Sequence, residues 1–183
     1  MNNKLKNFYS IIRKLKLTKR SGWINRGLNA DSISDHVYGA MSIGWKLANE
    51  ENVDTNKVIE LLLIHDWIMS VVPDVTPVSG KYDEKKDMEE NAKSKIVKVL
   101  GKKLGQKYLK LFDEFNKQST MEAKIAREAD KLETLLQGDA FEKEANKNDV
   151  LDEFLKTYSS IFSTKTGKEL FDEIVKDHSA RKE

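Results

Sequence analysis

A histidine and an aspartate stand side by side in the most apolar stretch of this sequence. The run Val58–Met69 consists mainly of Val, Ile and Leu, and it contains His65 and Asp66. A buried carboxylate is costly unless it is paired or bound to a cation, and His with Asp is a usual ligand combination for a divalent transition metal. The pair therefore predicts metal ligands, and a buried His65–Asp66 hydrogen bond that only fixes the core is the alternative.

Three more polar side chains fall at or beside inward positions of the expected helices, namely His36, Asp130 and Glu133. Ser32 and Asp35 have the spacing of a capping box, which predicts a helix start just before His36. Asp130 lies beside an apolar helical stripe, with Glu133 one turn further on. The ordinary alternatives are a hydrogen-bonded core histidine for His36 and a lysine ion pair for Asp130.

Two loops carry groups that could act on a phosphate. Residues 18–28 show no helical period and include Arg20, Trp23 and Arg26. A guanidinium matches phosphate oxygens in geometry and charge, although loop arginines are often only solvated. Trp23 is a candidate for stacking on a sugar or base, or else it anchors the loop in the core. Asp74 follows the central apolar run, where it either forms a turn or faces the site.

Composition excludes several classes of protein. The 183 residues include 32 basic and 30 acidic side chains, a net charge of +2, so no strong field for nucleic acid is expected. Cysteine is absent, which excludes disulfides and a thiol nucleophile. No apolar run approaches the ~20 residues of a membrane span. We expect a cytoplasmic protein that binds neither nucleic acid nor membrane.

Only two prolines and nine glycines interrupt the chain, which favours long helices and predicts an all-α fold. Helices are expected at residues 3–16, from the cap at Ser32 to about Leu47, at 55–70, 81–98, around 108–115, at 121–145, and as one or two closing helices within 151–175. The first is expected to bury Leu5, Phe8, Tyr9, Ile12 and Leu15, and the one at 121–145 to bury Ile125, Ala129, Leu132 and Leu136. His178 is expected to be exposed in a disordered polar tail.

The order His36, His65–Asp66, Asp130 resembles the metal signature of the HD-domain superfamily, which is named after its His-Asp pair. Further segments are similar to one branch, which holds the bacterial YfbR-type 5′-deoxynucleotidases and their eukaryotic HD-domain relatives. These segments are Arg20–Trp23 with Arg26–Gly27, Asp31–His36, Pro73–Pro77, and Asp130–Glu133 with Gln137. The similarity covers about residues 5–145.

The resemblance implies a single-domain helical bundle around one divalent ion, with His36, His65, Asp66 and Asp130 as ligands. Two imidazoles and two carboxylates suit Mn²⁺, Co²⁺ or Fe²⁺, and Mg²⁺ or Zn²⁺ is possible. We expect one domain over residues 1–175. Its metal core is expected at about 18–140, its closing helices at about 146–175 and the polar tail at 176–183.

The reaction that the resemblance implies is hydrolysis of a nucleoside 5′-monophosphate, preferentially a deoxyribonucleotide, by a metal-activated water. Arg20 or Arg26 would stabilise charge on the phosphoryl oxygens. Asp74 could orient the water or protonate the leaving 5′-oxygen. The same resemblance suggests a homodimer.

One position departs from the family. Relatives of this branch usually carry Glu four residues after the His of the pair, and here that residue is Met69. On a continuous helix His65 and Met69 would share a face, so the missing carboxylate would have pointed at the site. Either Asp74 or Glu133 takes over its role, with slower turnover or on a different substrate, or the chain binds metal and nucleotide without turnover, as a sensor or partner-binding module. Phosphodiesterase activity on a cyclic or linear nucleotide ranks last, because the histidines for a second metal are missing.

Overall fold

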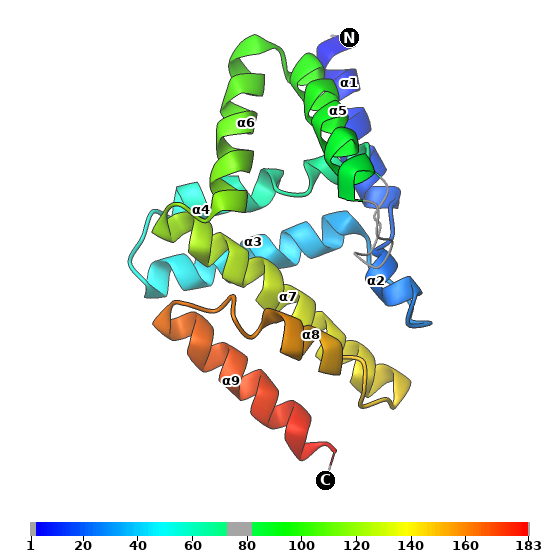
Figure 1. Ribbon diagram of the computed structural model, residues 1–183, viewed down its shortest axis with the longest axis vertical. Coiled ribbons are helices and arrows are strands. Elements are labelled where there is room, and N and C mark those ends of the chain that lie inside the picture. Colours follow the sequence, from blue (N-terminus) through cyan, green and yellow to red (C-terminus); the bar gives the residue numbers. More distant parts are fainter. Residues whose placement is uncertain (1–2, 73–81, 183) are drawn as a thin grey trace. The chain divides into compact units, whose positions relative to one another are not determined.

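The computed structural model describes residues 3–72 and 82–182, the side chains of 82–86 excepted, and within these ranges the chain is helical without a strand (Figure 1). The all-α prediction is confirmed. The elements are α1 (Asn3–Leu17), α2 (Ser21–Ile24), α3 (Ile33–Glu50), α4 (Thr55–Ile64), the 3₁₀ turn η1 (Trp67–Ser70), α5 (Tyr82–Leu100), α6 (Lys102–Lys117), α7 (Met121–Ala145), α8 (Asp152–Tyr158) and α9 (Lys165–Ala180).

The chain divides into two compact units. The first comprises Met1–Asp35 with Ile64–Asp113, and the second His36–Leu63 with Glu114–Glu183. This division does not test the predicted domain limits, which stay a prediction. Among the described residues, no helix combines the length and apolar character needed to cross a membrane.

In the first unit, α1 packs on η1 and α5. Trp67 of η1 stands at the centre of this packing, with its ring 5.3 Å from that of Phe8 and stacked 5.9 Å from that of Tyr108. The stripe predicted for α1 is only partly right, because Leu5 and Tyr9 are exposed and Ile11 is buried instead. The buried residues of α1, Ile11 and Leu15, both lie in its second half.

The predicted central helix at 55–70 is wrong in its second half. The α-helix ends at Ile64, His65 and Asp66 form a turn, and the chain continues as η1. Asp66 has φ −99° and ψ 6°, outside the α-helical basin, so the helical ladder cannot pass through it. Met69 therefore does not sit one helical turn after His65.

In the second unit, α3 and α4 approach each other at Gly44. A Cβ there would overlap Leu62 and lie 3.2 Å from Val58 Cγ1, and both of these α4 side chains are fully buried. The 25-residue helix α7 is capped at its N-terminus by Thr120, whose hydroxyl accepts from the Ala123 N–H. Helix α9 runs beside α7 (Figure 1).

The predicted stripe of α7 holds at Ile125, Ala129 and Leu132, but Leu136 is exposed and Leu135 takes its place inside. The predicted tail is also wrong. Helix α9 continues to Ala180, and His178 is buried at 4% exposure because two carboxylates surround its ring.

Candidate metal and phosphate site

His65 and Asp66 occupy the turn that joins α4 to η1. The His65 side chain is buried, and its Nε2 lies 3.5 Å from Oδ2 of Asp66. The next residue, Trp67, holds the turn in place through its ring contacts with Phe8 and Tyr108. Burial raises the pKa of the Tyr108 hydroxyl above its usual range, as expected for a ring enclosed in this aromatic group.

His36 lies in the first turn and a half of α3, where it meets two carboxylates from α7. Its Nε2 is 3.1 Å from Oδ1 of Asp130, and its Nδ1 contacts Oε2 of Glu133. All three side chains are buried, at 2% exposure for His36, 3% for Asp130 and 7% for Glu133. The predicted inward placement of His36 and Asp130 is confirmed.

The second oxygen of Asp130 faces two cations of its own helix. Lys131 Nζ lies 2.9 Å from Oδ2, and Arg127 Nη1 lies 3.5 Å from the same atom. Lys131 also lies over the ring of Tyr158, and Arg127 over the ring of Phe115. Lysine pairing, the alternative considered for Asp130, is therefore present, but it engages one carboxylate oxygen and His36 meets the other.

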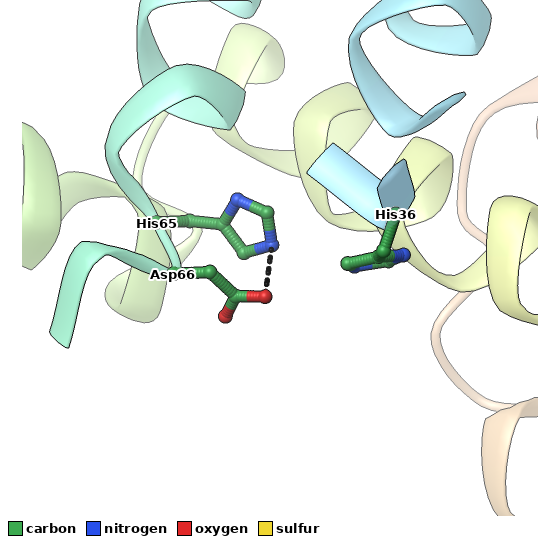
Figure 2. Close-up of side chains that lie close together, drawn as sticks. All are labelled: His36, His65 and Asp66. Carbon is green, nitrogen blue, oxygen red and sulfur yellow. Dashed lines mark ion pairs between the residues drawn. The ribbon is translucent and has the colours of Figure 1, made fainter. Parts of the chain in front are cut away.

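Three of the predicted ligands come together. His36, His65 and Asp66 each offer one ligand atom, and these atoms all lie within 4.8 Å of one another, while Figure 2 shows the two imidazoles and the carboxylate close together. A neutral imidazole nitrogen and a carboxylate oxygen both present lone pairs, so they face each other favourably only around a proton or a cation. Two buried imidazoles with a carboxylate fit a divalent transition metal in donor type and spacing.

A short backbone bridge ties the arginine-bearing segment to the start of α3. Lys19 pairs with Ser32, and the Arg20 N–H donates to Asp31 O at 3.1 Å. The capping box that follows is confirmed, because the Ser32 N–H donates to Asp35 Oδ2 at 2.9 Å and the Asp35 N–H donates to Ser32 Oγ at 3.1 Å. The Ser32 N–H, and after it the Ser32 hydroxyl, hold the pKa of Asp35 below its ordinary value.

The two arginines and the tryptophan have different environments. Arg20 lies 3.8 Å from Asp31 Oδ2, and its guanidinium lies 5.4 Å from the centre of the Trp23 ring. Trp23 itself is 1% exposed, which favours the loop-anchoring alternative over stacking on a substrate. Arg26 donates from Nη1 to the carbonyl of Gly22 at 2.8 Å, a contact that braces the same loop.

A cavity of about 330 Å³ opens in the first unit beside η1. Its described lining consists of Lys14, Thr18, Lys19, Ser21, Met69, Ser70, Val71 and Val72. Met69 thus faces a cavity that also bears two lysines and three hydroxyl groups. Asp74, the remaining predicted catalytic residue, lies outside the described residues.

Sequence reasoning missed two aspects of this region. The sequence suggests Glu133 as a substitute acid–base group, whereas its carboxylate contacts His36. Nothing in the sequence marks Gly39, on the next turn of α3, although a Cβ there would lie 2.9 Å from Glu133 Cγ. A glycine three residues after a suspected ligand on the same helix is a weak signal, because many helical glycines have no such contact.

Comparison with known proteins agrees with the sequence resemblance. Residues 12–174 match the family described as HD domain. A protein from Dictyostelium discoideum named 5′-deoxynucleotidase HDDC2 is 33% identical over 167 residues, 86% of each chain. The Saccharomyces cerevisiae 5′-deoxynucleotidase YGK1 is 32% identical over 160 residues, 84% of this chain and 74% of the yeast protein. The solved structure of a conserved hypothetical protein from Pyrococcus furiosus superimposes with a TM-score of 0.77 at 26% identity, covering 94% of this chain and 99% of that one.

Proposed function

The chain belongs to the HD-domain family, and on that premise we propose that it is a metal-dependent 5′-nucleotidase acting on (deoxy)ribonucleoside 5′-monophosphates. Its relatives from Dictyostelium and yeast, both named 5′-deoxynucleotidases, match most of the chain at about one-third identity. The observation that carries the proposal is the set of ligand atoms of His36, His65 and Asp66 within 4.8 Å of one another.

The ligands in this proposal are His36, His65, Asp66 and Asp130. The 3.1 Å separation of His36 Nε2 and Asp130 Oδ1 supports including the fourth residue, since atoms that share an ion come this close. A bound Mn²⁺, Co²⁺ or Fe²⁺ class ion would supply Lewis acidity, by lowering the pKa of a water and polarising a phosphoryl oxygen. Lys131 and Arg127 leave Oδ1 of Asp130 as the oxygen that faces His36.

For the phosphate we favour Arg20 over Arg26. Arg26 already donates a 2.8 Å hydrogen bond to Gly22 O, within its own loop. The Arg20 guanidinium lies 3.8 Å from Asp31 Oδ2 and 5.4 Å from the centre of the Trp23 ring, and its fork of donors matches the oxygens of a phosphate. Its backbone is also fixed by the bridge that leads into α3. A guanidinium held in this way would stabilise the charge that develops on the phosphoryl oxygens.

The proton transfers fall to Asp74 in this proposal. It would orient the attacking water or protonate the leaving 5′-oxygen. Glu133 is a poor substitute, because its carboxylate is buried against His36. Trp23 is assigned to anchoring the loop that carries Arg20 rather than to contacting the substrate.

The second candidate is a binding module that holds metal and nucleotide without turnover. The observation in its favour is Met69, a thioether where relatives usually place a carboxylate. Loss of one acid–base group typically lowers a rate by ~10²- to 10⁴-fold, so slow catalysis is the expected consequence rather than none. The names of the relatives likewise favour an enzyme. The predicted homodimer remains a prediction, which light scattering at micromolar concentration can test.

The test is phosphate release from a panel of deoxy- and ribonucleoside 5′-monophosphates. Metal-stripped protein is assayed with Mn²⁺, Co²⁺ or Mg²⁺ added back, beside Met69→Glu. Metal-dependent turnover by the natural sequence is the expected result. Activity that appears only in Met69→Glu would establish the binding module, and no phosphate release from either protein would reject the nucleotidase.

A further inference from the structure

The carboxylate of Glu133 contacts the ring nitrogen of His36 other than the one that faces Asp130. Glu133 lies on α7 and His36 on α3, 97 residues apart, and Oε2 of Glu133 meets Nδ1 of His36. Both side chains are buried, so water does not compete freely for either group. The contact therefore fixes the orientation of the His36 ring from the side opposite Asp130.

This contact also decides which ring nitrogen carries hydrogen. An ionised carboxylate has only acceptor atoms, so the hydrogen must be on Nδ1 of His36 for the contact to be favourable. With a metal ion bound the ring would be neutral, and Nε2 would present its lone pair to the ion; Nε2 is also the atom 3.1 Å from Asp130 Oδ1. Metal-binding histidines commonly use such an outer carboxylate to fix the tautomer and raise the basicity of the ligand nitrogen.

Gly39 creates the space that Glu133 occupies. A Cβ at Gly39 would lie 2.9 Å from Cγ of Glu133 and 3.1 Å from its Oε1. Glycine inside a helix lowers helix stability by about 1 kcal/mol relative to alanine, so we expect a structural cause for glycine at this position. The reason is the close approach, because Glu133 is buried and cannot withdraw from a new methyl group without leaving His36.

We propose that Glu133 is a positioning residue that acts through His36, setting Nε2 as its ligand nitrogen, and that Gly39 is required for this contact. The proposal rests on the metal assignment of the proposed function. It removes Glu133 from the groups that could replace the carboxylate missing at Met69. In this proposal the packing of α3 on α7 contributes to metal affinity as well as to the stability of the fold.

The first experiment is nitrogen-15 NMR of the histidine rings in the metal-free, full-length protein. The chain has three histidines, so signals are assigned by substituting each in turn. We expect a hydrogen on Nδ1 of His36 that exchanges slowly with water in the natural sequence and in Glu133→Gln, whose amide oxygen still accepts. The protection is expected to be lost in Glu133→Ala and in Gly39→Ala. An unprotonated Nδ1 in the natural sequence would overturn the proposal without any variant being needed.

The second readout is Mn²⁺ or Co²⁺ binding by calorimetry. Glu133→Ala and Gly39→Ala are expected to weaken binding by about 10- to 100-fold, whereas Glu133→Gln stays within a few-fold of the natural sequence. Glu142→Gln is the matched control, because Glu142 is a buried carboxylate of the same helix that contacts His178 instead. Folded Glu133→Ala with unchanged affinity would refute the proposal. Loss of nucleotidase activity alone would bear on the proposed function and leave the tautomer result standing.

Discussion

Oε2 of Glu142 on α7 lies 3.0 Å from Nδ1 of His178 on α9, and both side chains are almost fully buried. Nε2 of the same ring lies 2.8 Å from Oδ1 of Asp152, so one histidine joins α9 to α7 and α8. Hydrogen bonds from Lys182 and then His178 hold the pKa of Asp152 below its usual range. The last turns of α9 are thus anchored by a buried polar cluster.

Replacing His178 with alanine is expected to lower the free energy of unfolding by about 1–3 kcal/mol, because Glu142 keeps its burial and loses a partner. Urea denaturation followed by circular dichroism measures the change. Lys165→Ala is the control, since that lysine is exposed and its 3.9 Å ion pair with Glu169 lies at the surface. Equal stability of the two variants would contradict the role assigned to His178.

Replacing His65 with alanine is expected to abolish tight metal binding. The variant is loaded with Mn²⁺ or Co²⁺, passed through a desalting column and analysed for metal by mass spectrometry. His178→Ala provides a matched comparison, because it removes a buried histidine that lies among other partners. Full metal content in His65→Ala would show that the ligand assignment is wrong.

Replacing Arg20 with alanine is expected to lower kcat/KM by roughly 10²-fold, as for loss of one group that stabilises charge in the transition state. Lysine at this position should restore only part of the activity, because it lacks the guanidinium fork. Arg26→Ala should have a smaller effect on kcat/KM and a larger one on the stability of residues 21–26. Steady-state kinetics with a deoxyribonucleotide distinguishes the two arginines, and the reverse order would exchange their roles.

Replacing Asp35 with asparagine is expected to reduce stability at neutral pH but not in strong acid. The pKa of Asp35 is lowered on folding from its ordinary 3.8, chiefly by the Ser32 N–H. The stabilisation is therefore fully present above pH 3.8 and is lost as the pH falls through the lower value of the folded state. Urea titrations from pH 7 to pH 2 should show the two proteins converging at the acidic end. Asp172→Asn, on an exposed face of α9, should run parallel to the natural sequence.

Local chemistry explains which parts of the fold the sequence could predict. The capping box depends on Ser32 and Asp35 alone, and it was found at the predicted residues. The end of α4 depends instead on the packing of Trp67 against Phe8 and Tyr108, which are distant in sequence. A helical period continues through such a turn without a visible break, so the prediction extended the helix to residue 70.

The buried polar residues, those of the candidate site included, also differ in how far the sequence could predict them. His36 and Asp130 were singled out because polar residues at or beside inward helical positions are conspicuous. The burial of His178 could not be found this way, because its partner Glu142 lies 36 residues earlier and looks like one more surface acid. The contact of Glu133 with His36 spans 97 residues and depends on how closely α3 and α7 approach at Gly39.

The pairing of Lys19 with Ser32 has a consequence for how specificity could change during evolution. Residues 20–31 form a loop that is closed at its base by this pair and by the Arg20–Asp31 backbone hydrogen bond. Because the cost of closing a loop grows only slowly with its length, residues can be inserted or removed at its tip without disturbing the base. The surface that we propose to meet a substrate can therefore diversify while the start of α3, and His36 with it, stays constant.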